Sequence, residues 1–415
     1  MATKQLLPSG TWRLRAYGFD TANPNKRVQF SKTWTPPRGM TAKRAEKEAE
    51  RLAIEFETEV RGGVSMKGDT TLAEYFDWWR NAYVVPNLAP KTVLEYSKLW
   101  RRVNEYMGNV KVKDVDAIKI QAFYGWLKSS VKHERTGKPL SDSTIHHYHV
   151  LLSSMFREAV HKGFVQFNPC REGRVTPPKV IDEEAYHCTP EQVQRLASGL
   201  EREPTVFRAM VLLYLNTGMR KSELHGLRWD DFNAESGILR IERQLQYIER
   251  QGLTVRYPKT KRGSRSIKLP PSLCALLDEW REEQATWKAA VEEDWATGYG
   301  RKNPEVQNAS PDTPWMFTDE YGNPRHPDSF LSRFKAFLKR AGFSPEEIKA
   351  IHTHTLRHTN ASILIAANVN QTTLSNRLGD APQTISRVYA HALQRADEAA
   401  SEVLDVAITA AANIK

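Results

Sequence analysis

The chain has 415 residues and a formal net charge of +11 at pH 7. That length exceeds one ordinary domain and favours two or three, each with its own core. We find no uninterrupted apolar run of membrane-spanning length and no signal-peptide pattern, so we expect a cytoplasmic protein with no membrane partner. The three cysteines lie far apart in no metal-like or disulfide-like spacing, and we assign them no function.

The positive charge is concentrated in the front part of the chain. Residues 1–44 carry nine Lys and Arg against one acid, Asp20, and residues 1–178 hold the whole net charge of +11. Such a field suits attraction to a phosphate backbone, with affinity that falls as salt rises. Solubilising surface charge would produce the same excess, so charge alone leaves both readings open.

The first predicted element is a small sheet. Residues 12–17 alternate between apolar and polar side chains, and a similar run follows the turn-rich segment DTANPNK. This pattern predicts a hairpin or small sheet. Apolar residues at helical spacing after Thr41, ended by Gly62 and Gly63, predict a helix. Residues 1 to about 63 therefore form a predicted sheet-plus-helix module.

Four helices are predicted between about residue 70 and residue 178. The first carries an apolar stripe from Leu72 to Tyr83, the second follows Pro90, the third starts near Asp116 and the fourth runs from Ser141. Prolines at 169, 177 and 178 mark a linker. A compact, basic, helical domain is expected.

Residues 180–395 are predicted to be helical with one β interruption. A helix from Pro204 ends near Gly218, a short helix restarts around Arg220, and strand-like runs occupy 238–248, 252–257 and 264–269. Residues 286–312 resemble a loop or insertion, and 396–415 form an Ala-rich helical tail. The predicted fold is multidomain and α-dominated α+β.

Two motifs in this part suit the binding of a phosphate. TGMRKSEL places Arg220 at a helix start with Glu223 one turn further, and HTLRHT places His354 and Arg357 on one helical face. A guanidinium and an imidazole there can donate to two non-bridging oxygens of one phosphate and stabilise a pentacovalent transition state. An ordinary helix with solvated side chains would give the same motifs, so each motif alone leaves both readings open.

Two further segments carry a proton donor and a nucleophile. The lysines of YPKTKRGSR lie between strand-like runs, on a predicted hairpin turn, where an ammonium can reach a leaving oxygen. Tyr389 follows a break at 379–382 in a segment otherwise suited to a helix. A phenol becomes a good nucleophile when its proton leaves.

The ordered set TGMRKSEL, PKT, HTLRHT, LG and Y-A-H, spread over about 170 residues, resembles the signature of the tyrosine recombinase or phage-type integrase family. That family contains site-specific DNA recombinases of phages and integrative mobile elements. The resemblance covers 180–395. By order and character, 70–178 resembles the family's core-type DNA-binding domain and 1–63 its arm-type module, whose candidate DNA contacts are Arg13, Arg15, Arg27 and Lys32.

The resemblance also implies a role for each residue of the site. Its members would be Arg220, Lys259, His354, Arg357, Asp380 and Tyr389, supported by Glu223, His358 and His391. The arginines and His354 would activate the scissile phosphate, Lys259 would protonate the departing 5′ oxygen, and Tyr389 would form a 3′-phosphotyrosyl bond. Because that bond retains the free energy of the phosphodiester, we expect no metal, no ATP and no other cofactor.

Asp380 departs from the family pattern. Related sequences commonly read LGH, where His or Trp helps to hold the phosphate, and this one reads LGD. An ionised carboxylate cannot donate to a phosphate oxygen and repels it. Either another group does that work, with His391 and His358 as candidates, or Asp380 points away or is held by an Arg or Lys.

The resemblance implies integration and excision of a mobile element by a homotetramer on double-stranded DNA with core and arm sites, in the bacterial cytoplasm. An excision factor or a host DNA-bending protein would be a further partner, and the tail would dock on a neighbouring protomer or on its own domain. Two alternatives stay open: a type IB topoisomerase with nearly the same chemistry, and a non-cleaving DNA-binding protein, which Asp380 favours.

Overall fold

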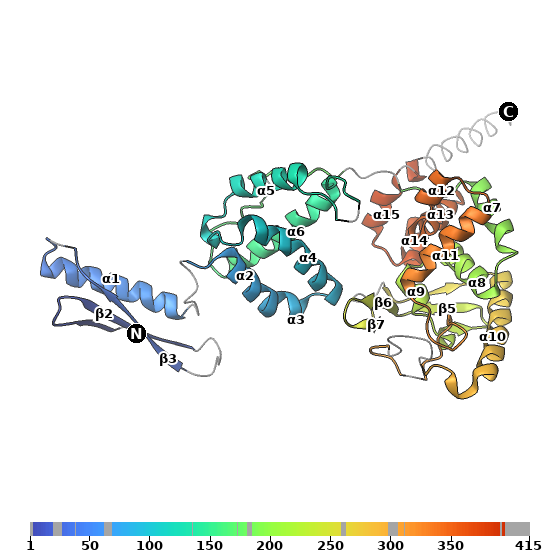
Figure 1. Ribbon diagram of the computed structural model, residues 1–415, viewed down its shortest axis with the longest axis horizontal. Helices are drawn as coiled ribbons and strands as arrows, with labels where there is room; N and C mark the ends of the chain where they lie inside the picture. Colours follow the sequence, from blue (N-terminus) through green and yellow to red (C-terminus); the bar gives the residue numbers. More distant parts are fainter. Residues whose placement is uncertain are drawn as a thin grey trace, which may run out of the picture. The chain divides into compact units, whose positions relative to one another are not determined.

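The computed structural model describes residues 3–19, 27–37, 39–61, 69–134, 136–171, 173–180, 185–258, 263–297, 306–310, 312–390 and 392–394. The chain divides into two compact units, Met1–Ile181 and Asp182–Lys415. Helices dominate both units; among the described residues the first unit has one small antiparallel sheet and the second has two, which confirms the predicted fold class (Figure 1). Lys259, His391 and the predicted tail at 396–415 lie outside the described residues.

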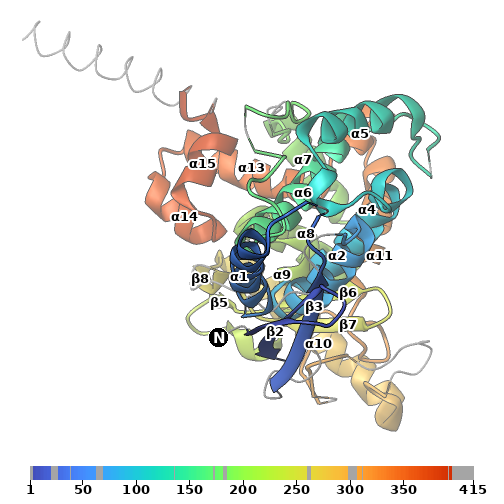
Figure 2. The same cartoon turned by 90° about the vertical axis from the view of Figure 1, so that its left-hand side faces the viewer.

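The first unit begins with a three-stranded antiparallel sheet. Its strands are β1 (Thr3–Leu6), β2 (Trp12–Phe19) and β3 (Arg27–Trp34), with β2 in the middle. Helix α1 (Ala42–Arg61) lies beside β2 and β3 (Figure 2), and buries Leu14 against Ala49 and Ala53. The predicted alternation is confirmed, since Leu14 and Ala16 are buried while Arg13 and Arg15 are partly exposed.

The rest of the first unit is a small helical domain. It contains α2 (Leu72–Trp79), a π-helical turn (Arg80–Val84), α3 (Val85–Asn87), α4 (Pro90–Met107), a 3₁₀ turn (Val112–Asp114), α5 (Ala117–Ser130) and α6 (Asp142–His161). The four predicted helices are confirmed. Thr71, Asp116 and Ser141 cap the starts of α2, α5 and α6 by accepting a backbone N–H. Leu72, Phe76 and Trp79 are buried in one core, as their spacing predicts.

The second unit has the following helices: α7 (Pro190–Leu200), α8 (Thr205–Thr217), α9 (Lys221–His225), α10 (Pro271–Val291), α11 (Pro327–Arg340), α12 (Pro345–Ala350), α13 (Thr353–Ala366), α14 (Gln371–Leu378) and α15 (Pro382–Val388). Its strands are β4 (Phe232–Asn233), β5 (Ile238–Ile241), β6 (Gln244–Ile248), β7 (Gly252–Arg256) and β8 (Arg265–Lys268). Short 3₁₀ turns occupy Trp229–Asp231 and Glu292–Asp294. None of the helices in the described ranges is long and apolar enough to cross a membrane.

The strands of this unit form two sheets, within the prediction of a β hairpin or sheet in the catalytic domain. β5 pairs with β4 and β8, whereas β6 pairs only with β7. The predicted run 238–248 is therefore two strands of different sheets. The prediction that the YPKTKRGSR segment forms a hairpin turn is wrong: it connects β7 to β8 of the other sheet, because Arg265 pairs with Ile241 rather than with a residue of β7. Its residues 259–262 lie outside the described part of the chain.

The segment 286–312 is partly helical rather than a loop throughout. Helix α10 continues to Val291, and beyond residue 286 Trp287 is partly buried against the main core of the unit. The ring centroids of Trp280 and Trp287 are 5.0 Å apart, and Trp229 Nε1 donates to Gln284 Oε1 at 2.6 Å. The hydrogen bond from Trp229 connects α10 to the rest of the unit, whereas the Trp280–Trp287 contact lies within the helix.

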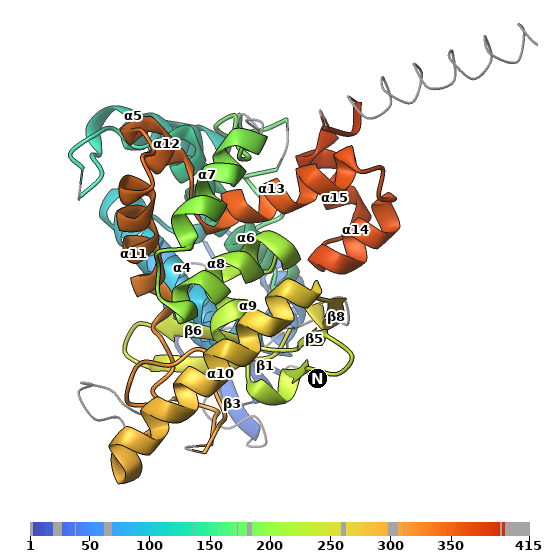
Figure 3. The same cartoon turned by 90° about the vertical axis from the view of Figure 1, so that its right-hand side faces the viewer.

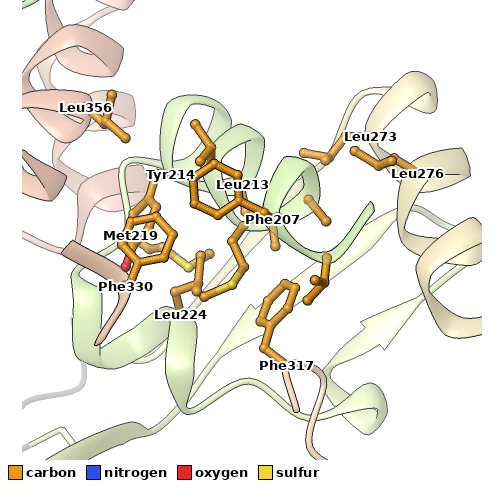
Figure 4. Close-up of a cluster of buried hydrophobic side chains, with 14 of the residues drawn as sticks. Phe207, Leu213, Tyr214, Met219, Leu224, Leu273, Leu276, Phe317, Phe330 and Leu356 are labelled. Atoms are coloured by element: carbon orange, nitrogen blue, oxygen red, sulfur yellow. The ribbon is translucent and has the colours of Figure 1, made fainter. Parts of the chain in front are cut away.

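The main core of the second unit surrounds α8. Residues from α8 pack with side chains of α9, α10, α11, α13 and the loop before α11 (Figure 4), including Phe207, Leu213, Tyr214, Leu224, Leu273, Leu276, Phe317, Phe330 and Leu356. Helices α13, α14 and α15 lie together beside α8 (Figure 3) and bury a smaller cluster that contains Leu378, Ile385 and Tyr389. Buried apolar packing thus brings the segment around Arg220, after α8, close to the segments of α13 to α15 that carry Arg357 and Tyr389.

Candidate active site

Arg220 stands directly after the central helix. Gly218 ends α8 in the left-handed conformation, with φ of 60°, and Arg220 is the N-cap residue of α9. Glu223, one turn further, accepts from the Arg220 backbone N–H at 2.9 Å and from its Nη1 at 3.0 Å. The predicted arrangement of this motif is therefore present, and Arg220 keeps one third of its side chain exposed.

Arg357 is buried on α13 and joins the ends of two other helices. Its Nη1 donates to the carbonyl of Gly218 at 2.5 Å, and its Nη2 donates to the carbonyl of Leu378 at 2.9 Å. Carbonyls at helix C-termini lack partners within the helix and carry partial negative charge, so they stabilise a buried guanidinium. Arg357 is thereby held beside Arg220 although 137 positions separate the two in the chain.

Asp380 lies between the two arginines. Arg220 Nη2 donates to its Oδ1, and Arg357 Nη2 donates to its Oδ2, the latter at 2.5 Å. Its backbone carbonyl accepts from Ser375 Oγ at 2.6 Å. Of the alternatives that the sequence left open for Asp380, the structure shows a carboxylate held by arginine.

Tyr389 ends α15 and is buried, with its hydroxyl 3.0 Å from Nδ1 of His358. Burial, with a smaller contribution from Asp380, raises the pKa of Tyr389 to about 12, although the charge of Arg357 acts in the opposite direction. Burial, together with the charges of His354 and Arg357, lowers the pKa of His358 to about 4. A neutral imidazole therefore faces a protonated phenol at neutral pH.

His354 lies on the exposed side of α13, one turn before Arg357. Partial desolvation of its ring lowers the pKa of His354, and the charges of His352, Arg357, Arg220 and Lys221 lower it further. The charges of Arg220 and Lys221 act on His354 because the segment TGMRKSEL lies close to the segment HTLRHT in the fold. The structure thus brings His354, Arg220, Arg357, Asp380, His358 and Tyr389 into one region.

Arg265 was not identified from the sequence. It lies at the start of β8, where its Nη2 donates to Glu223 Oε2 at 2.7 Å and its Nε donates to the carbonyl of Arg377 at 2.8 Å. Both side chains of the Arg265–Glu223 pair are almost fully buried. Burial alone raises the pKa of Glu223, but the hydrogen bonds and charges of Arg265 and Arg220 outweigh it and hold this pKa below its ordinary value.

The sequence pattern of β8, in which inward and outward residues alternate, could have indicated that Arg265 is buried. Arg265 and Ile267 share the inward face of β8, and both are buried. An arginine at an inward strand position requires an anionic or carbonyl partner inside the protein. The sequence could not identify Glu223 as the anionic partner of Arg265, because the two residues are 42 positions apart in the chain.

The candidate DNA contacts of the first module lie on two faces of its sheet. Arg13 and Arg15 alternate with Leu14 and so lie on the face away from α1, whereas Lys32 pairs directly with Leu14 and lies on the α1 side. Arg27 begins β3, and its side chain is outside the described residues. Within the described ranges, no group of three or more His, Cys, Asp or Glu is placed to hold a metal ion.

Comparison with known proteins identifies the family. Residues 187–395 match the model of the phage integrase family, and residues 72–175 match that of the phage integrase SAM-like domain. The chain belongs to the phage integrase family. It is therefore a tyrosine recombinase, an enzyme of the class that carries out site-specific recombination for mobile elements.

Three similar proteins illustrate the match. A tyrosine recombinase XerC-like protein of Caldanaerobacter subterraneus subsp. tengcongensis is 28% identical over 378 residues, covering 87% of this chain and 90% of the relative. The integrase of transposon Tn1549, bound to transposon right-end DNA, superposes with a TM-score of 0.64 at 21% identity, covering 81% of this chain and all of that one. A lambda integrase tetramer bound to a Holliday junction gives 0.51 at 15% identity, covering 91% and 95%. The two structural similarities show a shared fold.

Proposed function

We propose that Arg220, Arg357 and His354 bind the scissile phosphate of DNA and that Tyr389 attacks it. The observation that carries this proposal is the convergence of two arginines on the two oxygens of one carboxylate. Two guanidiniums placed in this way can bind two non-bridging oxygens of one phosphate and stabilise the charge of its transition state. Tyr389 belongs to the same cluster, since Arg357 and Asp380 both act on its pKa.

Each bond and proton in the cleavage step has an assigned group. The Tyr389 oxygen bonds to phosphorus while the bond from phosphorus to the 5′ oxygen breaks. The phenol proton passes to Nδ1 of His358, which is neutral and within hydrogen-bond distance. Lys259 gives a proton to the departing 5′ oxygen. Religation is the reverse reaction with another 5′ hydroxyl, so the chemistry consumes neither ATP nor a metal ion.

The role of phosphate donor, which His or Trp fills in related sequences, passes in this proposal to His391. His358 was the other candidate, but its Nδ1 faces the Tyr389 hydroxyl and its ring packs edge-on against the tyrosine at 5.6 Å. His358 is therefore engaged with the nucleophile. Glu223 supports Arg220 and does not contact the reacting atoms.

The parts before the catalytic domain are proposed to bind DNA. In this organisation 1–63 binds arm sites, 70–178 binds core sites and 180–395 carries out catalysis. The net charge of +11 in residues 1–178 supports it, as does the match of 72–175 to the SAM-like domain. Arg13 and Arg15, partly exposed on the sheet face away from α1, are proposed to contact the DNA backbone.

The active assembly is proposed to be a homotetramer that acts on two DNA sites in the bacterial cytoplasm. The lambda integrase with the same fold was solved as a tetramer on a Holliday junction. In this proposal the protein integrates and excises a mobile element, assisted by an excision factor or a host DNA-bending protein. The tail at 396–415 would dock on a neighbouring protomer.

A selection for covalent complexes tests the proposed chemistry and finds the target site in the same experiment. A pool of nicked duplexes with random sequence around the nick is incubated in EDTA with the wild-type chain, with Tyr389→Phe, and with Tyr247→Phe as a control at an exposed tyrosine. Covalent complexes are then isolated on denaturing gels, and their DNA and linked peptide are sequenced. We expect adducts for the wild type and the control, linked to Tyr389, and none for Tyr389→Phe.

The other outcomes separate the alternatives. An adduct mapped to a different tyrosine would overturn the assignment of the nucleophile. DNA binding without any adduct would favour a non-cleaving DNA-binding protein. Relaxation of a supercoiled plasmid that carries the selected site, without strand exchange between two such sites, would favour topoisomerase chemistry.

A further inference from the structure

Asp380 occupies the position of an anion in the phosphate site. One carboxylate oxygen accepts from Arg220 and the other from Arg357, which is the two-point arrangement that arginines make with a phosphate. The carboxylate is four-fifths buried, and the Arg357 side chain is 5% exposed. The arginine pair is therefore already neutralised in part in the DNA-free chain.

The hydrogen-bonding capacity of Arg357 is nearly used up. Its Nη1 donates to the Gly218 carbonyl, and its Nη2 donates both to the Leu378 carbonyl and to Asp380. A terminal guanidinium nitrogen has two hydrogens, so Nη2 has none left for a further acceptor. A phosphate oxygen can reach this nitrogen only if one of the present acceptors leaves.

Asp380 is the acceptor that can leave at the lowest cost. The carbonyls of Gly218 and Leu378 belong to helix ends packed in the core, whereas Asp380 lies in the short connection between α14 and α15. A phosphate and a carboxylate on the same arginines would also repel each other strongly in a partly buried site. We therefore expect that a phosphate and the Asp380 carboxylate do not bind the two arginines at the same time. Arg357 Nη2 has no hydrogen left for a second anion, and the two anions repel each other.

We propose that Asp380 is an internal ligand of the phosphate site, which holds Arg220 and Arg357 at the spacing of two anion oxygens and is displaced when a phosphate binds. Asp380 then acts as a positioning residue and as a competitor of the substrate. This inference goes beyond the proposed function, but it rests on that function for the identity of the phosphate in DNA. Related sequences with a neutral residue at this place lack such a competitor.

Displacement of Asp380 also affects the nucleophile through the chain. Asp380 is followed directly by Ala381, the N-cap residue of α15, and α15 ends at Tyr389. Ser375, which hydrogen-bonds the Asp380 backbone, remains on α14. A phosphate that replaces the carboxylate therefore acts on the start of the helix that carries the tyrosine, and couples occupation of the site to the position of Tyr389.

The first test measures anion binding without DNA. Inorganic phosphate is titrated calorimetrically, in low-chloride buffer, into the full-length chain and into Asp380→Asn and Asp380→His. Loss of a competing charge worth roughly 1.4 kcal/mol or more corresponds to a gain of at least about tenfold in phosphate affinity for both neutral variants. Asp380→Glu, which keeps the charge, and Asp278→Asn, which removes an exposed carboxylate on α10, are expected to bind like the wild type.

A further variant shows whether the gain arises at this site. Arg220→Ala combined with Asp380→Asn is expected to lose the tenfold gain, because phosphate then has only one arginine. Unchanged or weaker phosphate binding by both neutral variants, with thermal unfolding temperatures close to the wild type, would overturn the proposal. If the variants unfold at lower temperature, the titration is repeated below the start of that transition, where the same criterion holds.

The second test uses cleavage on a suicide duplex under single-turnover conditions. Asp380→Asn is expected to reach half of its maximal cleavage rate at a DNA concentration about tenfold below that of the wild type. A half-saturating concentration that does not fall would contradict competition by Asp380. Failure of Tyr389 to form an adduct would instead refute the proposed function and leave the phosphate titration, which contains no DNA, to decide the role of Asp380.

Discussion

The Tyr389 hydroxyl and His358 Nδ1 are 3.0 Å apart, and the two side chains approach each other from different helices of a small apolar cluster. Burial lowers the pKa of His358 to about 4, so its ring is neutral and able to accept the phenol proton through most of the physiological range. This contact supports the proposal that His358 is the base for Tyr389, a role that the order of the sequence motifs did not reveal.

A substitution at His358 tests this role. We expect His358→Phe, which keeps a ring beside Tyr389, to lower the single-turnover cleavage rate by about 100-fold or more, the usual loss for a general base. His358→Asn serves as the control, since it retains a hydrogen-bonding side chain but is not a base, and it should be impaired to a similar degree. A His358→Phe variant that cleaves at the wild-type rate would exclude His358 as the base.

The same assignment predicts the pH dependence at low DNA concentration, which reports the ionisation of the free enzyme. Because the pKa of His358 is lowered to about 4, the base form persists as pH falls, and kcat/KM should show no histidine-like decrease between pH 8 and pH 5. An ordinary histidine would lose activity below about pH 6.5. A decrease centred near that value, absent in His358→Asn, would show that His358 has an unshifted pKa.

Gly218 is expected to tolerate no side chain. Its φ of 60° disfavours other residues, and a Cβ there would lie 2.5 Å from Leu378 Cδ2 and 3.0 Å from Asn360 Oδ1. Backbone strain and overpacking together predict a loss of about 2–4 kcal/mol for Gly218→Ala, measured by thermal unfolding of the full chain. The yield of covalent adduct should fall too, since the Gly218 carbonyl holds Arg357.

Gly342 provides the matched control for this substitution. It also has a left-handed φ, 79°, but nothing lies within 4 Å of a Cβ built there. We expect Gly342→Ala to cost only about 1–2 kcal/mol and to leave adduct formation intact. Equal losses for the two variants would mean that close packing at Gly218 contributes nothing.

The buried pair of Glu223 and Arg265 is expected to position Arg220. Removing Arg265 leaves the buried Glu223 carboxylate with only the partly exposed Arg220 as a charged partner, so Arg265→Gln should cost about 3 kcal/mol. Arg265→Gln and Glu223→Gln together should cost less than the sum of the single variants, because the double variant leaves no buried charge of this pair. A double-mutant cycle measured by thermal unfolding would give additive losses if the 2.7 Å contact contributed no coupling.

Arg13 and Arg15 are expected to contact phosphates of an accessory site. Arg13→Gln with Arg15→Gln should weaken DNA binding by the full chain and reduce the slope of log affinity against log salt by about 2. Arg44→Gln with Arg51→Gln, which removes the same charge from α1, is the control for net charge. An equal change of slope in both pairs would mean that only overall charge matters, and no change in the first pair would refute the contact.

Lys259 is expected to be the general acid, as its PKT position implies. Lys259→Ala should slow cleavage of a normal duplex by about 100-fold or more. The rate should recover on a duplex with sulfur in place of the scissile 5′ oxygen, because a thiolate leaves without a proton. Lys261→Ala is the matched control. Full cleavage of the normal duplex by Lys259→Ala, or rescue of Lys261→Ala alone, would assign the acid elsewhere.

The sequence by itself determined the helical periodicity, the starts of most helices and the family. Caps such as Thr71, Asp116 and Ser141, and apolar stripes such as that of Leu72, Phe76 and Trp79, act within one or two turns, so local order is sufficient to predict them. The family motifs are likewise short runs with a fixed order. The same local rules located Arg220 at a helix start and Tyr389 after a break.

Only the tertiary structure decided which distant groups meet. Strand pairing within one sheet joined β8 to β5, although the sequence pattern suggested a hairpin with β7. Packing of α13, α14 and α15 beside α8 placed Asp380 between Arg220 and Arg357, and Arg265 against Glu223. Such contacts depend on the burial of side chains from separate elements and on charge neutralisation inside the fold, which have no periodic signature in the sequence.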